Sequence, residues 1–268
     1  MIKIILSDID GTFLKDDKTP TDLTAQAAKS VVARGLKFVF VSARMPEAIY
    51  PITDAIDMPR PPVISYGGGF VLTEDEKILF DKKMPLVDAK NILSELKRGW
   101  QDITLNFYTG RRWFVEEIDD RVKFEMKITG ATAEVKNFDA LLTENISPNK
   151  IMVICEPPTC AEMETVLSKK FPALNVVRSA PFLLEVMDKT VSKATGIEVL
   201  LKHYGFALDE AVAFGDNYND AEMLTLIPQS VAMANAPDAV KKLAAAVTDS
   251  NEDSGIYTYL VKIGVIKP

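Results

Sequence analysis

The sequence contains few of the residues on which many catalytic sites depend. Its 268 residues include one histidine, His203, and two cysteines, Cys155 and Cys160. One histidine excludes a mechanism that combines a histidine base with histidine ligands, and it argues against a Ser-His-Asp triad. Two cysteines make neither a disulfide framework nor a zinc site, and we expect them to be thiols in a reducing compartment. Acid–base chemistry therefore falls to carboxylates, Lys, Tyr or Cys.

The sequence also lacks a net positive charge and long apolar runs. The formal net charge is −7, which argues against non-specific nucleic-acid binding, because such binding needs a basic surface. No run of about 18 uncharged apolar residues occurs, so we predict no transmembrane helix. The N-terminus reads as a strand carrying Lys3 and Asp8 rather than as a signal peptide. We expect a cytoplasmic protein without membrane or nucleic-acid partners.

The most informative stretch opens the chain. An Ile- and Leu-rich run from Ile4 ends in Asp8-Ile9-Asp10-Gly11-Thr12, which indicates a buried strand closed by a turn. Asp8 and Asp10 would share a face of an extended strand. Two carboxylates this close repel each other unless a cation lies between them or one is protonated, and Mg²⁺ takes such oxygen ligands. The alternative is a strand that ends in a solvated Asp turn.

The pattern up to residue 82 alternates strands and helices. We predict strands at Lys37–Val41 and Val63–Tyr66, a helix from Asp22 to Arg34 capped by Thr21, and a helix over 46–56. With the opening strand, this order predicts a parallel sheet with right-handed crossovers.

The pattern changes in the middle of the chain and later returns. Strands around the turn Thr109-Gly110-Arg111 form a predicted hairpin, mixed with helices, which is typical of a separate α+β unit. From about 189 helices and strands alternate again. We therefore predict an α/β fold: a Rossmann-like parallel-sheet core of residues 1–82 and 189–268, with an α+β cap domain inserted over 83–188.

Four signals fall at the carboxyl ends of predicted strands, where ligands bind in open α/β sheets. They are Asp8 with Asp10, Ser42-Ala43-Arg44, the Gly67–Gly69 loop, and Gly215-Asp216-Asn217-Tyr218-Asn219-Asp220. Carboxylates that hold Mg²⁺, a short hydroxyl and backbone N–H groups suit a phosphate ester. Lys193 stands near the start of its helix, where the helix dipole disfavours a cation, so it is a functional candidate; the alternative is a solvated surface lysine.

Together these motifs resemble the haloacid-dehalogenase-superfamily phosphatases, in the Cof-type branch that carries a large α/β cap. Asp8-Ile9-Asp10-Gly11-Thr12 matches the family's first motif, and Ser42 matches the second. Lys193 matches the third, and the Gly215–Asp220 segment matches the fourth. The order and spacing of the motifs fit this branch over essentially the whole chain.

The resemblance implies a role for each matching residue. Asp8 would be the nucleophile and Asp10 the general acid and base. Mg²⁺ would be held by the Asp8 carboxylate, the Asp10 backbone carbonyl and Asp216. The remaining implied contacts are phosphate binding by Ser42, the Ala43 backbone N–H, Lys193 and Asn219, with Thr12 and Asp220 supporting these residues. By its position, Arg44 is a candidate for contact with the leaving group, with a solvated or structural role as the alternative.

Two departures from the family pattern stand out. Ala43 replaces the usual Gly, which keeps the backbone N–H, and the Gly67–Gly69 loop replaces the usual Asn-Gly-Ala, which removes an amide that could orient the substrate. In the cap, Arg111, Arg112 and Arg178 are candidates for substrate contact, with a solvated or structural role as the alternative to each.

The function that this resemblance implies is Mg²⁺-dependent hydrolysis of a small phosphorylated metabolite, such as a sugar phosphate, by a monomer or weak homodimer. A phosphomutase of the same superfamily and a non-catalytic sensor of phosphorylated ligands are the alternatives.

Overall fold

The computed structural model describes residues 1–268, which form two compact units. The first unit comprises Met1–Arg44, Ile49–Phe80 and Ser192–Pro268, and the second comprises Met45–Ala48 and Asp81–Val191. One sheet has eight strands and the other has six. None of the helices combines the length and the apolar character that a membrane span requires.

The first unit is built on the eight-stranded sheet, whose strand order is β14-β13-β12-β1-β2-β3-β4-β5. Its strands are β1 (Ile4–Ser7), β2 (Lys37–Val41), β3 (Val63–Ser65), β4 (Phe70–Leu72), β5 (Ile78–Asp81), β12 (Ala211–Gly215), β13 (Gln229–Ala232) and β14 (Ala246–Val247). Its helices are α1 (Asp22–Ala33), α2 (Pro46–Ala55) from Ile49 onward, α7 (Lys193–Tyr204), α8 (Ala221–Leu226), α9 (Asp238–Lys241) and α10 (Gly255–Lys262), with 3₁₀ turns η1 (Tyr66–Gly68), η2 (Leu208–Glu210) and η3 (Tyr218–Asp220).

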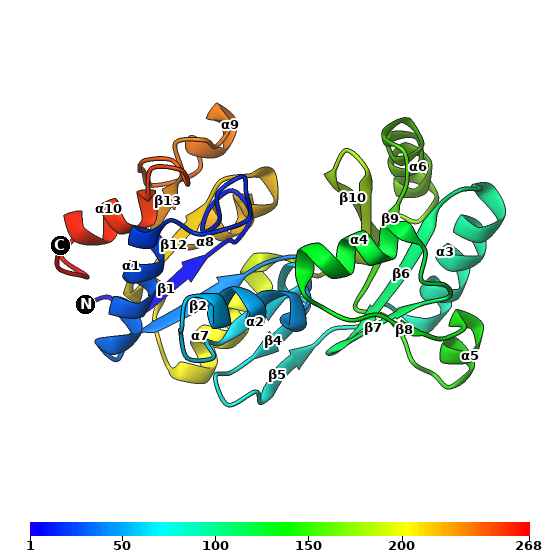
Figure 1. The fold of residues 1–268 in the computed structure, drawn as a ribbon, viewed down its shortest axis with the longest axis horizontal. Coiled ribbons are helices and arrows are strands. Elements are labelled where there is room, and N and C mark those ends of the chain that lie inside the picture. Colours follow the sequence, from blue (N-terminus) through cyan, green and yellow to red (C-terminus); the bar gives the residue numbers. More distant parts are fainter. The chain divides into compact units, whose positions relative to one another are not determined.

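Strand β1 lies near the middle of this sheet, between β12 and β2 (Figure 1). All pairings from β14 to β3 are parallel. Ser7, the last residue of β1, is opposite Phe214 of β12 and Phe40 of β2. Because parallel strands end at the same edge, the residues that follow β1, β2 and β12 are neighbours in space. The α/β fold class predicted from the sequence is confirmed.

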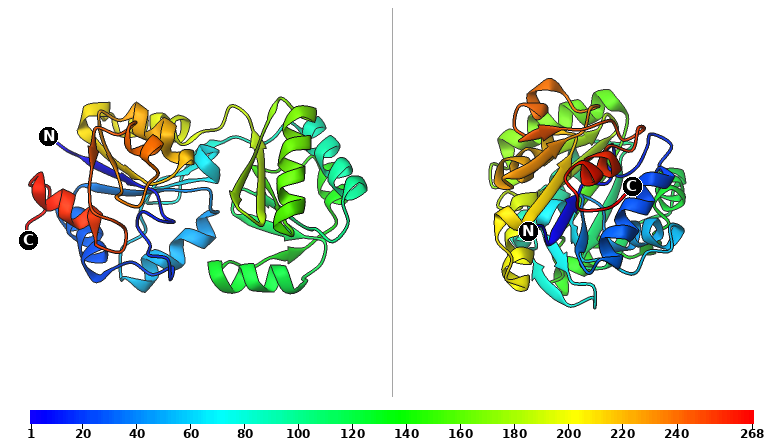
Figure 2. Two further views of the ribbon diagram at one scale, coloured as in Figure 1. Left: turned by 90° about the horizontal axis from the view of Figure 1, so that it is seen from above. Right: turned by 90° about the vertical axis from the view of Figure 1, so that its left-hand side faces the viewer.

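Helices cover both faces of the sheet. Helices α7 and α8 lie on one face, and α1 and α10 lie on the other (Figures 1 and 2). Alternate residues of each strand supply the two faces, so Ile4 packs with Ile197 and Leu200 of α7. On the opposite face, the rings of Phe214 and Tyr259 of α10 are 5.8 Å apart. The strands buried on both faces explain the continuous apolar runs in the sequence.

One edge of the sheet departs from the predicted parallel pattern. Strand β4 pairs antiparallel with β3, and β5 continues the sheet beyond it. The segment Thr73–Lys77 between them is polar and folds as a turn, in which Thr73 accepts a backbone hydrogen bond from Glu76. A short antiparallel edge on a parallel sheet is common.

Helix α7 begins directly after a capping serine. The Ser192 side chain accepts a hydrogen bond from the Thr195 N–H at 3.3 Å, so Lys193 is the first helical residue. The helix ends at Gly205, whose φ of 68° provides the left-handed residue that commonly terminates helices. This capping places the Lys193 side chain at the start of the helix.

The second unit has the strand order β10-β11-β9-β6-β7-β8. Its strands are β6 (Thr104–Thr109), β7 (Arg112–Val115), β8 (Glu134–Val135), β9 (Lys150–Ile154), β10 (Leu174–Ala180) and β11 (Leu183–Asp188), and its helices are α3 (Leu86–Gly99), α4 (Asp120–Thr129), α5 (Phe138–Thr143) and α6 (Pro157–Lys170). Strands β6 and β7 form the predicted hairpin. Helices α3, α5 and α6 pack on one face of this sheet and form its apolar core with Phe107 and Phe114 (Figure 2).

Candidate active site

A buried lysine joins two of the sequence-predicted carboxylates. Lys193 Nζ lies 2.5 Å from Asp8 Oδ1 and 2.5 Å from Asp220 Oδ1. Lys193 is 3% exposed, Asp8 is 5% exposed and Asp220 is fully buried. The alternative of a solvated surface lysine is therefore wrong for Lys193. Three segments that lie far apart in the sequence meet at this point: the end of β1, the start of α7 and the loop after β12.

Asp220 also shapes the loop that carries Asp216. Its second oxygen, Oδ2, accepts hydrogen bonds from the backbone N–H groups of Asp216 and Asn217, both at 2.9 Å. Asp220 thus binds Lys193 with one oxygen and fixes the turn after β12 with the other. This arrangement matches the supporting position that the sequence resemblance implies for it.

Asp216 packs directly against the turn that follows β1. Its Oδ1 accepts a hydrogen bond from Thr12 Oγ1 at 2.7 Å. Gly11 has a φ of 86°, and a Cβ atom built on it would collide with Asp216 Oδ2. A residue with a side chain at position 11 would therefore be strained and would displace the carboxylate. The Gly-Thr pair of the first motif positions Asp216 as well as the turn itself.

The carboxylate cluster carries more negative charge than the protein compensates. Asp8, Asp216 and Asp220 offer oxygen atoms that all lie within 4.8 Å of one another. Burial raises the pKa of Asp8 well above its usual range; Lys193 opposes this, and the charges of Asp220 and Asp216 add to it. Burial likewise raises the pKa of Asp216 to about 6, against the hydrogen bond from Thr12. The three carboxyl groups of this cluster therefore share one ammonium group, that of Lys193.

These residues fit a divalent cation. The cluster is buried, its donors are all oxygen atoms, and its excess charge is what such an ion would neutralise. The set differs in one respect from the predicted ligands Asp8, Asp10 and Asp216, because the clustered side chains are those of Asp8, Asp216 and Asp220. The sequence resemblance assigns only the backbone carbonyl of Asp10 to the metal.

The Asp10 carboxylate is held by two cations instead. Arg44 donates from Nε to Oδ2 at 2.8 Å and from Nη2 to Oδ1 at 2.7 Å. Lys18 Nζ lies 3.0 Å from Oδ1. Burial alone would raise the pKa of Asp10, but Arg44 and Lys18 outweigh it and lower the pKa to about 2. Arg44, expected at the leaving group, is therefore paired with the Asp10 carboxylate.

The loop after β2 presents its polar groups at the same edge of the sheet. Ser42 is buried, and its Oγ accepts a hydrogen bond from the Arg44 N–H at 3.2 Å, which leaves its hydroxyl proton to donate. Ala43 lies between them. Asn219 is exposed in η3, directly before Asp220. Binding of phosphate by Ser42, Ala43 and Asn219 remains a prediction.

The turn η1 stands where the family pattern has Asn-Gly-Ala, and it holds the Ser42 loop by backbone hydrogen bonds. The N–H groups of Tyr66 and Gly67 donate to the carbonyl oxygens of Arg44 and Ser42, at 3.2 and 2.9 Å. Tyr66 is fully buried with a φ of 51°, a conformation that is strained for a residue with a side chain. Gly68 packs so closely on the Ser192 carbonyl that a Cβ atom would collide with it. One turn thus contacts both the Ser42 loop and the start of α7.

Sequence reasoning missed three residues at this site. They are Lys18, which binds Asp10, and Asn235 and Asn251, which contact the turn after β1. Asn235 could have been found, because it closely follows β13, whose carboxyl end lies at the same edge of the sheet.

Other candidates from the sequence lie apart from this cluster. In the second unit, Arg111 pairs with Glu47, Arg112 with Glu134 and Arg178 with Glu164, so each arginine has a carboxylate partner. Burial raises the pKa of Cys155 to about 12, and Cys160 is also buried, so neither is a reactive thiol.

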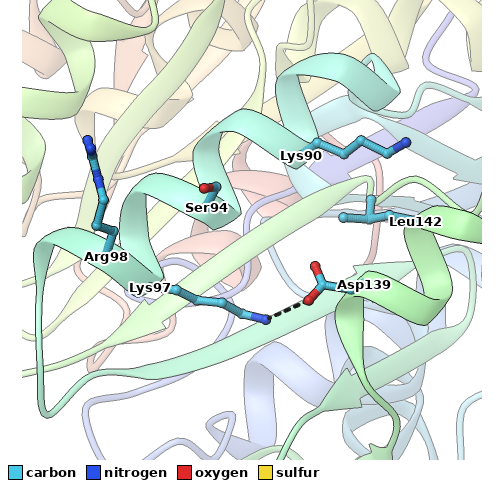
Figure 3. Close-up of a pocket in the computed structure, with 6 residues that line it drawn as sticks. All are labelled: Lys90, Ser94, Lys97, Arg98, Asp139 and Leu142. Carbon is cyan, nitrogen blue, oxygen red and sulfur yellow. Dashed lines mark ion pairs between the residues drawn. The ribbon is translucent and has the colours of Figure 1, made fainter.

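The second unit also has a surface groove of about 340 Å³ between α3 and α5 (Figure 3). Lys97 Nζ crosses it to Asp139 Oδ2 at 3.9 Å. Its lining is Lys90, Ser94, Lys97, Arg98, Asp139 and Leu142. None of these belongs to the four motifs, so the groove is not part of the candidate active site.

Comparison with known proteins identifies the class to which this site belongs. A family model described as a haloacid dehalogenase-like hydrolase matches residues 5–260. A Haemophilus influenzae protein named "Putative phosphatase" is 31% identical over 257 residues, which covers 96% of each chain. The chain therefore belongs to the haloacid dehalogenase-like hydrolase family. The resemblance inferred from the motifs is confirmed.

Solved structures agree with this assignment. A Thermotoga maritima protein is 26% identical, with a TM-score of 0.86 over 98% of this chain and 97% of that one. A Bacteroides thetaiotaomicron protein, described among phosphatases of the HAD enzyme superfamily, is 25% identical, with a TM-score of 0.79 over 99% of this chain and 96% of that one. The prediction that the chain is an enzyme, a hydrolase of the phosphatase type, is confirmed.

Proposed function

We propose that the protein hydrolyses the phosphomonoester of a small phosphorylated metabolite, with a sugar phosphate as the first candidate, through an aspartyl-phosphate and with Mg²⁺. The observation that carries this proposal is the buried Asp8, bound through one oxygen to Lys193 and adjacent to Asp216 and Asp220. A buried carboxylate next to excess negative charge is poorly suited to a structural role. It suits a nucleophile whose charge is balanced by a cation and by Lys193.

In the first step, the Asp8 oxygen that Lys193 does not bind attacks phosphorus, and the bond from phosphorus to the leaving oxygen breaks. Asp10 gives its proton to that oxygen. While Arg44 and Lys18 hold it, Asp10 is ionised at neutral pH, because its pKa is about 2. We propose that the dianionic phosphate competes for Arg44 as it binds, which raises the pKa of Asp10 and lets it carry the proton.

In the second step, Asp10 acts as the base. It accepts a proton from water, whose oxygen attacks phosphorus, and the bond between Asp8 and phosphorus breaks to release phosphate. The pair with Arg44 and Lys18 favours the ionised form that this step requires. The Ser42 hydroxyl, the Ala43 N–H, Lys193 and Asn219 bind the phosphoryl oxygens in both steps.

Asp8, Asp216 and the Asp10 carbonyl would hold Mg²⁺, which shields the anionic nucleophile from the anionic phosphate when it is bound. Thr12 and Asp220 orient these ligands through their contacts with Asp216. We propose residues 1–82 and 189–268 as the catalytic domain and residues 83–188 as the domain that selects the leaving group. The protein would act as a monomer or weak homodimer.

The test is a screen of the purified protein against phosphorylated metabolites with Mg²⁺ or with EDTA, measuring free phosphate. We expect Mg²⁺-dependent phosphate release from at least one sugar phosphate. Asp8→Asn should abolish it, whereas Asp16→Asn, a change in an exposed residue of the following loop, should not. Isomer formation without free phosphate would establish a phosphomutase instead. Tight binding without turnover of any ester would establish a sensor.

The intermediate has its own test. Rapid quenching in acid should trap a phosphorylated protein that hydroxylamine cleaves, as expected for an acyl phosphate. Absence of this species from an active enzyme, in wild type and in the slowed Asp10→Asn variant, would rule out the covalent route.

A further inference from the structure

Asn235, in the loop after β13, reaches two segments of the active site with one amide group. Its Nδ2 donates to the Gly11 carbonyl oxygen at 2.8 Å and lies 3.5 Å from Asp216 Oδ2. Gly11 belongs to the turn after β1, and Asp216 follows β12. The Asn235 side chain therefore connects the two segments that carry the proposed metal ligands, although it belongs to none of the four motifs.

The orientation of this amide is fixed by a second asparagine. The Asn251 N–H donates to Asn235 Oδ1 at 3.3 Å, so the Nδ2 of Asn235 faces Gly11. The Asn251 side chain is 4% exposed, and its Nδ2 donates to the Leu14 carbonyl oxygen at 3.0 Å. Both asparagines thus hold the same turn, one near its start and one at its end. We name this pair the asparagine strap.

The strap completes the set of donors around Asp216. Thr12 Oγ1 donates to Oδ1, and Asn235 Nδ2 lies 3.5 Å from Oδ2. The absence of a Cβ at Gly11 lets the turn approach that same oxygen. Each carboxylate oxygen therefore has a protein group that limits its movement. Partners of metal ligands that restrict their orientation commonly raise metal affinity.

We infer that Asn235 is a positioning residue for the divalent cation, because it fixes the Gly11 turn and Asp216 relative to each other. This inference rests on the proposed function, in which Asp8, the Asp10 carbonyl and Asp216 hold Mg²⁺. Asn235 itself is exposed. Its side chain can therefore be removed without opening the apolar core.

The experiment measures Mg²⁺ binding by isothermal titration calorimetry on chelator-treated wild type, Asn235→Ala, Asp216→Asn and Asn91→Ala. Asn91 is an exposed asparagine of α3 in the second unit and serves as the matched control. We expect Asn235→Ala to raise the Kd for Mg²⁺ by about tenfold, the lower end of what such partners contribute. Asn91→Ala should bind Mg²⁺ like wild type.

Two further readings decide the outcome. The melting temperature of Asn235→Ala in EDTA should stay within about 3 °C of wild type, because exposed substitutions change stability little. The inference would be overturned if the Kd of Asn235→Ala for Mg²⁺ were unchanged. It would also be overturned if a higher Kd came with a much lower melting temperature. If wild type binds no Mg²⁺, the proposed metal site fails. A different result would refute only the role of Asn235: wild type and Asn235→Ala bind Mg²⁺ with the same Kd, and Asp216→Asn does not bind it.

Discussion

Replacing Asp216 with the neutral, equally sized asparagine should stabilise the protein in the absence of divalent cations. Burial raises the pKa of Asp216 from 3.8 to about 6, with the charge of Asp220 adding to the effect. The folded state therefore favours the protonated carboxyl group. At neutral pH the ionised group destabilises the fold. The substituted amide would remove that charge, and its oxygen could still accept the hydrogen bond from Thr12.

The magnitude follows from the size of the pKa change. A rise from 3.8 to about 6 corresponds to ~3 kcal/mol. Because the folded pKa is raised, the neutral form stabilises the fold fully below about pH 3.8, and this contribution is lost as the pH rises through about 6. Asp216→Asn should therefore match wild type near pH 4 and exceed it by up to ~3 kcal/mol at pH 7.5. Neighbouring carboxylates can take up a proton in place of Asp216, so this free-energy difference is an upper limit.

The assay is urea denaturation of wild type and Asp216→Asn in EDTA across pH 4 to 8, repeated with saturating Mg²⁺. Asp238→Asn, at a carboxylate that is 92% exposed, is the matched control and should change little. Mg²⁺ at about 100 times its Kd should stabilise wild type by ~2.7 kcal/mol and leave Asp216→Asn unchanged. The reasoning fails if Asp216→Asn is no more stable than wild type at pH 7.5 in EDTA, or if it responds to Mg²⁺ as wild type does.

Three other substitutions test the site, each by one measurement. Asp8→Asn should keep the fold and reduce turnover below detection, and appreciable residual phosphate release would count against Asp8 as nucleophile. Arg44→Ala should raise the pKa of Asp10 from about 2 toward its usual value. In urea denaturation, the variant should be about 1 kcal/mol less stable than wild type at pH 7, and the difference should disappear as the pH falls from 4 toward 2. Equal stability of the two proteins at pH 7 would refute this. Gly68→Ala should collide with the Ser192 carbonyl, displace the start of α7 and lower kcat at least tenfold, and wild-type kinetics would show that the turn tolerates the added atom.

The core of the fold could be predicted because its strands are short apolar runs that end in polar motifs. The cap of α7 at Ser192 depends on local hydrogen bonding, in which the Ser192 side chain accepts from the Thr195 N–H. The sequence does not predict strands β4 and β5, because strands of three and four residues on either side of a polar turn have no distinctive pattern. The six-residue helix α5 was missed for the same reason.

In the site, too, some contacts could be predicted from the sequence and others could not. Contacts that follow from strand ends, such as Asp8 beside Asp216, could be expected from parallel topology alone. The pairing of Asp10 with Arg44 and Lys18 could not, because it depends on side-chain conformations in a loop. Lys18 has a φ of 67°, and no local sequence rule assigns that conformation to a lysine. The pairing of Asp10 with the cations that lower its pKa, Arg44 first and Lys18 second, is therefore visible only in three dimensions.

Asp8 and Asp10, the two aspartates proposed as catalytic, differ because their surroundings have opposite effects on the carboxylate charge. Burial among other carboxylates raises the pKa of Asp8, while Arg44 and Lys18 lower that of Asp10. In identical surroundings the two groups would titrate together and could not divide nucleophilic attack from proton transfer. Under the proposed mechanism, a bound cation would favour ionised Asp8, and an anion that competes for Arg44 would let Asp10 hold a proton. A metal ion and a phosphate ester would supply those two charges, so we expect both aspartates to reach their reactive forms only when substrate and metal are bound together.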